Sequence, residues 1–134
     1  MKAKVKWVSE ELFLGTSASG HTIELDANNG ATAPSPLENV LISLGACSSV
    51  DVVSILQKAR QAIVGCTVEI NGTRVDTVPK LFSDIHLHFI ITGNNIKEKH
   101  VERAVALSAD KYCSVALMLN KSVNISHDFE IITS

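Results

Sequence analysis

The stretch that decides the fold is residues 35–47, SPLENVLISLGAC, because it carries a complete signal for the start of a long helix. Ser35 is a favourable N-cap, Pro36 suits the first helical position, and Glu38 stands where a capping box requires its acid. Apolar residues then recur at helical spacing until the pattern fades near Gln61. We therefore predict one helix from Pro36 to Gln61, roughly 39 Å long at 1.5 Å per residue.

Strands and a second helix are expected on either side of this segment. Alternating residues and turn residues predict three short strands before it, and two longer strands, a helix and a closing strand after it. The expected ranges are strands at 3–8, 12–15, 21–26, 64–75, 81–92 and 123–132, and helices at 36–61 and 96–120. We find no repeat or linker, so residues 1–134 are expected to form a single α+β domain in the order βββ-α-ββ-α-β.

The composition argues against several functional classes. The net charge is −2 and the basic residues are scattered, which argues against nucleic-acid binding. The N-terminus has no apolar signal core and polar residues interrupt the long helix, so we expect a cytoplasmic protein without a membrane partner. Hydrophobic residues make up 46% of the chain and charged residues only 19%. Because a small monomer does not easily bury so much apolar surface, we expect a homo-oligomer.

Cys47 and Cys113 each lie in the middle of a predicted helix, too far apart for a CxxC motif or a zinc knuckle. Each is either a small core residue or half of a thiol pair that the fold assembles. In a redox pair, one thiolate would cleave a peroxide bond and the resulting sulfenic acid would condense with the second thiol. Asp51, one turn after Cys47 on the same helix face, disfavours a thiolate, so an activating cation must come from another element or subunit. Cys66, at the start of a predicted strand, is expected to have a packing role.

The histidines offer a weaker alternative. His86 and His88 share one face of a predicted strand and could bind a metal together with His127. They also lie on the polar face of that strand, and we favour simple solvent exposure. The sequence contains no GxSxG, Walker-type or HExxH motif.

Two segments carry a resemblance to a known family. APSPLE at residues 33–38, leading to LGAC at 44–47, resembles the start of the central helix in the OsmC/Ohr family. ADKYCSVA at residues 109–116 is similar to that family's second cysteine helix, and the order of elements agrees over nearly the whole chain. The resemblance implies an OsmC-like fold, with an intertwined homodimer around the long helices and two active sites at its interface.

The resemblance also implies an activity, namely a thiol-dependent peroxidase that reduces organic hydroperoxides, and also hydrogen peroxide, without a metal, flavin or other cofactor. Cys47 would be the peroxidatic residue, Cys113 the resolving residue and Glu38 a supporting residue. A small thiol or a lipoyl-protein would reduce the disulfide. The family's arginine in the N-terminal strands has no counterpart in residues 10–16, and Lys6 or Lys111 would have to replace it. The alternative function is a non-catalytic dimer that binds a small apolar ligand at the helix interface.

Overall fold

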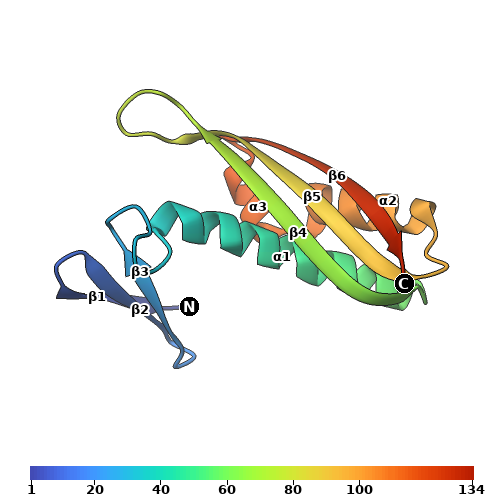
Figure 1. The fold of residues 1–134 in the computed structure, drawn as a ribbon, viewed down its shortest axis with the longest axis horizontal. Coiled ribbons are helices and arrows are strands. Elements are labelled where there is room, and N and C mark those ends of the chain that lie inside the picture. Colours follow the sequence, from blue (N-terminus) through green and yellow to red (C-terminus); the bar gives the residue numbers. More distant parts are fainter. The chain divides into compact units, whose positions relative to one another are not determined.

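A computed structural model describes residues 1–134, which divide into two compact units, residues 1–42 and 43–134 (Figure 1). The first unit contains an antiparallel sheet of β1 (Ala3–Ser9), β2 (Leu12–Ser17) and β3 (Thr22–Asp26). Helix α1 (Pro36–Lys58) begins in the first unit and continues in the second. The second unit continues with β4 (Ala62–Arg74), β5 (Phe82–Asn94), α2 (Glu98–Leu107), the π-helix η1 (Ser108–Tyr112), α3 (Ser114–Leu119) and β6 (Asn124–Thr133). The predicted α+β class and order of elements are confirmed.

Both ends of α1 have a local cause. At the start, Ser35 N donates to Glu38 Oε1 at 2.9 Å and Glu38 N donates to Ser35 Oγ at 3.2 Å, which is the predicted capping box. The helix ends at Lys58, earlier than the predicted Gln61. Arg60 adopts a left-handed φ of 58°, Arg60 N donates to Gln57 O, and Gln61 N donates to Leu56 O. This pair of bonds is a Schellman motif, which closes the helix.

The sheet of the second unit has the order β4-β5-β6, with β5 antiparallel to β4 and parallel to β6 (Figure 1). Its inner face is apolar and packs against the helices. Leu87 and Phe89 of β5 are 3% and 1% exposed, and they pair in register with His127 and Phe129 of β6. The alternation predicted for the last strand is therefore confirmed, and His127 lies on the inner face.

The second helix differs from its prediction. One continuous helix was expected over residues 96–120, but it is divided into α2, η1 and α3, and Cys113 is an extended residue between the last two. In this π-turn Cys113 N donates to Ser108 O at 2.8 Å, so the turn contains one more residue than an α-turn. The buried face therefore moves forward by one position. Tyr112, expected in the apolar stripe, is 50% exposed, whereas Cys113 and Ala116 are buried.

Helix α1 combines a buried side with exposed apolar residues. By length and mean hydropathy, 1.7 over 18 residues, α1 would be able to cross a membrane, yet only 28% of that stretch is buried within the chain. Five residues at helical spacing make up its buried side: Leu44, Gly45, Ser48, Val52 and Leu56. The side chain of Ile70 in β4 occupies the space that a Cβ on Gly45 would need, so the helix lies close to the sheet.

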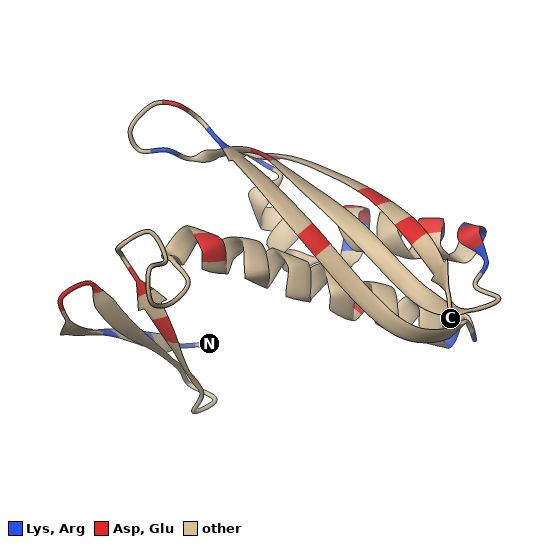
Figure 2. Ribbon diagram, viewed as in Figure 1, with Lys and Arg blue, Asp and Glu red and all other residues tan.

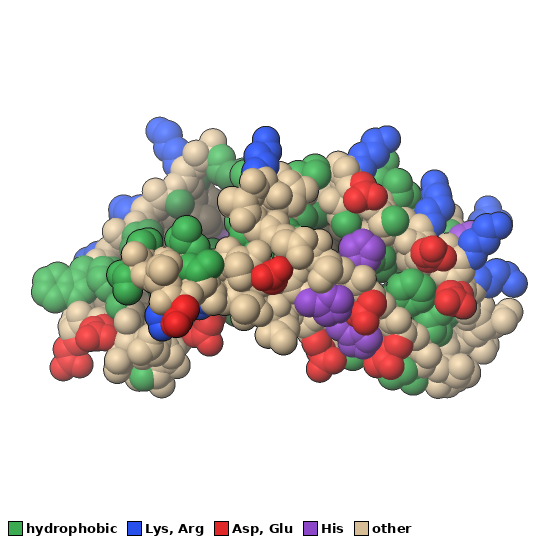
Figure 3. Space-filling model, turned by 90° about the horizontal axis from the view of Figure 1, so that it is seen from above, with side chains coloured by type: hydrophobic (Ala, Val, Ile, Leu, Met, Phe, Trp, Pro, Cys, Tyr) green, Lys and Arg blue, Asp and Glu red, His purple; other side chains and the backbone are tan.

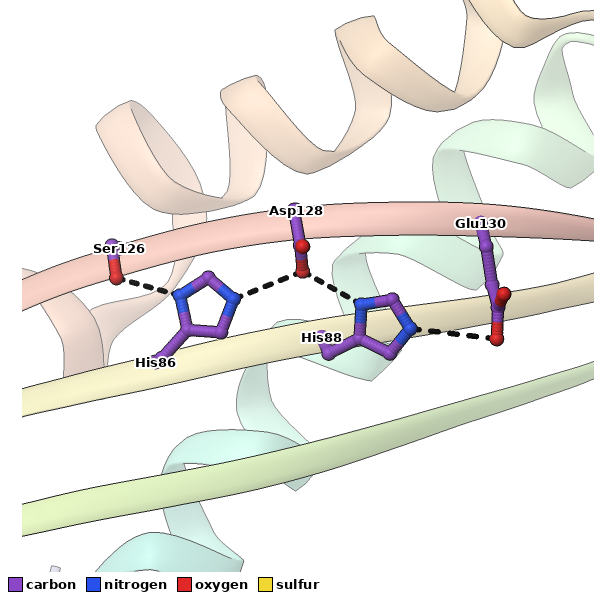
Figure 4. Close-up of polar contacts among 5 residues, drawn as sticks. All are labelled: His86, His88, Ser126, Asp128 and Glu130. Carbon is purple, nitrogen blue, oxygen red and sulfur yellow. Dashed lines mark hydrogen bonds and ion pairs between the residues drawn. The ribbon is translucent and has the colours of Figure 1, made fainter.

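The outer face of the same sheet is polar. Acidic residues lie on β4 and β6 (Figure 2), and histidine and acidic side chains lie next to one another on the surface (Figure 3). Figure 4 shows one chain of contacts: His86 Nδ1 bonds to Ser126 Oγ at 2.7 Å, and Asp128 Oδ1 accepts from His86 Nε2 at 2.9 Å and from His88 Nδ1 at 2.7 Å. His88 Nε2 lies 3.4 Å from Glu130 Oε1. Hydrogen bonding to Asp128 raises the pKa of His88, and hydrogen bonds from His88 and His86 lower the pKa of Asp128.

We expect Gly93→Ala to destabilise the protein by about 1–3 kcal/mol, because overpacking of a filled site costs about that much. A Cβ on Gly93 would overlap the Ala62 carbonyl oxygen and lie 2.8 Å from Ile96 Cδ1. Gly65→Ala is the matched control, since its Cβ would make an ordinary 3.6 Å contact with Thr92 Cβ. Urea unfolding of the two variants measures the difference. Equal stability of the two would contradict this description of the β4–β5 hairpin.

We expect Asp128→Asn to reduce stability more at pH 5.5 than at pH 9. Because the pKa of His88 is raised in the folded protein, the contribution of His88 to the stability is complete below its ordinary pKa of 6.5. This contribution is lost as the pH rises through the pKa of His88 in the folded state. The lowered pKa of Asp128 gives a contribution that is present above its ordinary value of 3.8 and is lost in acid. The pair therefore stabilises most between these two values, and melting temperatures at the two pH values measure the change.

Asp84→Asn is the control for this measurement. Hydrogen bonds from Asn124 and Ser83 lower the pKa of Asp84, and neither partner titrates in this range. The stability that Asp84→Asn loses should therefore be the same at pH 5.5 and at pH 9. A pH-independent loss in Asp128→Asn would show that the histidine charge does not stabilise the sheet.

Candidate functional site

The fold brings Cys47 and Cys113 together. Cys47 is partly buried on α1, and Cys113 is fully buried at the break between η1 and α3. The Cys47 thiol lies close enough to Cys113 to contribute to the rise in the pKa of the Cys113 thiol. The two cysteines, far apart in sequence, therefore form a thiol pair within the second unit. The expectation that Cys113 lies in the middle of a helix is wrong, because it is the N-cap residue of α3.

The Cys113 sulfur has two hydrogen-bond donors. Ser48 Oγ donates to Cys113 Sγ at 3.4 Å, and Ala116 N donates to the same atom at 3.4 Å. Burial raises the pKa of the Cys113 thiol, the bonds from Ser48 and Ala116 act in the opposite direction, and Cys47 adds to the rise. The sulfur is thus held by protein donors in a place where water does not reach it.

A second contact links α1 to the π-helix. Ser108 Oγ donates to Asp51 Oδ2 at 3.0 Å and lies 3.4 Å from Ser48 O. Asp51, expected to oppose a thiolate at Cys47, therefore also serves as an acceptor that fixes η1 against α1. Sequence reasoning missed Ser48 and Ser108. The available signals were that Ser48 follows Cys47 directly and that Ser108 falls in an apolar stripe.

Neither Glu38 nor Cys66 forms a hydrogen bond with Cys113, Ser48 or Ser108. Glu38 belongs to the first unit, where Oε1 completes the capping box. Cys66 lies on β4 and is partly buried. Burial raises the pKa of the Cys66 thiol, and a hydrogen bond with Ser49 opposes that rise.

Two cations, Lys58 and Arg103, lie in a groove of about 490 Å³ along α1 and α2. The same groove is lined by Asp51 and Tyr112, which are neighbours of the thiol pair along the chain. Among the cations considered from the sequence, Lys111 stacks over the ring of Tyr112, with its Nζ 5.5 Å from the ring centroid. Sequence reasoning missed Arg103, because α2 meets α1 only in the folded chain.

A partly open cavity of about 110 Å³ lies beside the thiol pair. Ser48 and Ala116, the two donors to Cys113, are part of its wall. The rest of the lining is mixed, with apolar residues from the sheet and helices and a few polar groups: Leu87, Phe89, Val105, Ser108, Ala109, Asp110, Asn120, Ile125 and His127. The cavity can hold a few water molecules or a very small ligand.

The three histidines considered as metal ligands do not converge. His86 and His88 bond to residues on the outer face of the sheet, as Figure 4 shows, whereas His127 pairs with Leu87 on the inner face. The sheet separates them. No group of three or more His, Cys, Asp or Glu side chains is arranged to hold a metal ion.

Known proteins are similar to this chain in fold and in sequence. A family model described as OsmC-like protein matches residues 27–128. Protein YhfA of Escherichia coli (strain K12) is 56% identical over 134 residues, which is 100% of both chains. A hypothetical protein from Aquifex aeolicus VF5 is 32% identical with a TM-score of 0.89, over 99% of this chain and 96% of that chain.

A more distant solved structure has the same fold. An organic hydroperoxide resistance protein OsmC from Legionella pneumophila is 17% identical, with a TM-score of 0.72 over 96% of this chain and 95% of that chain. The family resemblance seen in the cysteine segments is thus confirmed by sequence along the whole chain. The chain belongs to the family of OsmC-like proteins.

Proposed function

We propose that this protein is a thiol-dependent peroxidase that reduces organic hydroperoxides, and also hydrogen peroxide, through Cys47 and Cys113. The observation that carries the proposal is the proximity of the two thiols, which come from α1 and from the break between η1 and α3. The name of the Legionella pneumophila structure, an organic hydroperoxide resistance protein, supports the same chemistry.

The difference in burial supports distinct roles for the two cysteines. Cys47 is partly exposed, whereas Cys113 is 0% exposed. A peroxide would therefore reach Cys47 first, which suits Cys47 to the peroxidatic role and Cys113 to the resolving role. Glu38 is proposed as a supporting residue that orients an activating cation, since its capping bond uses only one carboxylate oxygen.

The proposed cycle has three balanced steps. The Cys47 thiolate attacks the O–O bond, which gives Cys47 sulfenic acid and an alkoxide that leaves as the alcohol after protonation. Cys113 then attacks the sulfenic sulfur, so that a disulfide forms and water is released. Two equivalents of a thiol, or one dithiol such as a lipoyl group, reduce the disulfide and become a disulfide themselves.

We also propose that the protein acts as a cytoplasmic homodimer, as proteins of this family are usually dimers. Exposed apolar side chains support a partner chain. Val5 and Trp7 of β1 are 63% and 64% exposed, and Val50 of α1 is 68% exposed beside the groove. A second copy that covers these residues would remove apolar area from water.

A second candidate function is that of a non-catalytic dimer that binds a small apolar ligand at the helix interface. The cavity of about 110 Å³ next to Ser48 is the observation in its favour. A protein with this function would form no Cys47 sulfenic acid on treatment with stoichiometric hydroperoxide, so the assay below separates the two functions.

We expect Cys47→Ser to reduce kcat/KM for cumene hydroperoxide by at least about 10³-fold, because the serine hydroxyl is not ionised at neutral pH. The assay follows peroxide consumption in the presence of a dithiol reductant. Cys113→Ser should still form one equivalent of sulfenic acid on Cys47, which dimedone would trap. Cys66→Ser is the matched control and should retain wild-type turnover. Unchanged turnover in Cys47→Ser would refute the peroxidase proposal.

We expect Val50→Asp to convert the dimer into a monomer, because a carboxylate in an apolar interface is costly to desolvate. Size-exclusion chromatography with light scattering measures the mass. Val64→Asp is the control, as Val64 is an equally exposed valine, 73%, located on β4 outside the α1 groove. A dimer that persists in Val50→Asp would place the interface elsewhere.

A further inference from the structure

The Cys113 sulfur is buried from solvent, although the resolving step of the proposed cycle requires it to react as a negatively charged thiolate. Cys113 is 0% exposed and Ser48, its side-chain donor, is 2% exposed. A thiolate in such a place cannot be stabilised by water, and burial alone raises the pKa of the thiol. Hydrogen bonds from the protein must supply the stabilisation instead.

Only two donors reach this sulfur. One is the Ala116 amide, which the backbone of α3 fixes, and the other is the Ser48 hydroxyl. The Ser48 hydroxyl belongs to the residue directly after Cys47, so α1 carries one thiol and the donor to the other thiol on adjacent residues. Ser48 is itself held in place, since its carbonyl oxygen lies 3.4 Å from Ser108 Oγ.

We propose that Ser48 is a positioning residue of the resolving step, whose hydroxyl holds the Cys113 sulfur next to Cys47 and stabilises the Cys113 thiolate as it attacks the Cys47 sulfenic acid. This inference rests on the proposed peroxidase function. In the step, the Cys113 thiol loses its proton, a bond forms between the two sulfurs, and the S–O bond of the sulfenic acid breaks. The departing hydroxide takes up the proton and leaves as water.

The same hydrogen bond directs the reduction of the disulfide. A thiol exchanges with a disulfide by attacking one sulfur and expelling the other as a thiolate. Cys47 is the more accessible sulfur, and Cys113 as leaving group keeps the donors Ser48 and Ala116. The reductant therefore forms its mixed disulfide with Cys47.

Few other charged or titratable groups lie near the Cys113 sulfur, where they could change the stability of its thiolate. Helix α1 contributes Cys47 and, through Ser108, the Asp51 carboxylate. The cavity wall adds Asp110 from η1 and His127 from β6. The inner residues of β5 at the cavity are apolar, so loss of the Ser48 hydroxyl would leave no substitute side-chain donor at the Cys113 sulfur.

The first test does not depend on peroxide. In Cys47→Ala/Cys66→Ala protein, Cys113 is the only cysteine, and its titration can be followed by NMR of a ¹³Cβ-labelled cysteine. We expect Ser48→Ala to move the titration to higher pH and Ser48→Thr, which keeps the hydroxyl, to restore it. The adjacent cavity of about 110 Å³ offers room for the extra methyl group. An unchanged titration in Ser48→Ala would overturn the inference.

The second test is a single turnover with one equivalent of cumene hydroperoxide in Cys66→Ser protein. Dimedone trapping and intact mass measure sulfenic acid and disulfide over time. We expect Ser48→Ala to form Cys47 sulfenic acid at the wild-type rate and to form the disulfide about tenfold more slowly, with Ser48→Thr close to wild type. Resolution at the wild-type rate in Ser48→Ala would refute the role of Ser48. Absence of both sulfenic acid and disulfide in the protein with native Ser48 would refute the peroxidase function itself, while the NMR titration would still report on the hydrogen bond.

Discussion

The close packing of α1 in the second unit is the constraint on which the rest of the structure depends. Gly45 has no side chain, so Ile70 of β4 occupies the space next to the helix. One turn later, the small Ser48 side chain allows the break between η1 and α3 to approach, and Cys113 lies beside Cys47. Larger side chains at these two positions would hold the sheet and the break away from the helix. The thiol pair therefore depends on two small residues as much as on the cysteines themselves.

The parts of the fold that have local signals could be predicted from the sequence. The capping box around Glu38 and the alternating face of β6 are both confirmed. The end of α1 could not be predicted, because Arg60 adopts a left-handed conformation that usually belongs to glycine. The π-turn could not be predicted either, because no glycine or proline marks the additional residue. Whether Tyr112 or Cys113 is buried was decided by packing against α1, and not by local propensity.

The candidate site was predictable only in part, for a related reason. Family-like motifs single out Cys47 and Cys113, but the residues that contact Cys113 lie on other elements or have ordinary sequence surroundings. No sequence motif marks Ser48 or Ser108, and their contacts between helical segments exist only in the folded chain. The sheet also separates two environments. Its outer face carries a solvated chain of histidines and carboxylates (Figure 4), while neutral donors satisfy the buried sulfur on its inner side.

The π-turn has a consequence for how such proteins diverge. Each residue of a helix advances the side-chain direction by about 100°, so deleting one residue within Ser108–Tyr112 would turn the second cysteine by about that angle relative to α2, away from the buried position beside α1. A single-codon deletion would thus separate the two thiols while both cysteines remain encoded. The length of the segment before the second cysteine is therefore an inherited character of its own, separate from the presence of the cysteine.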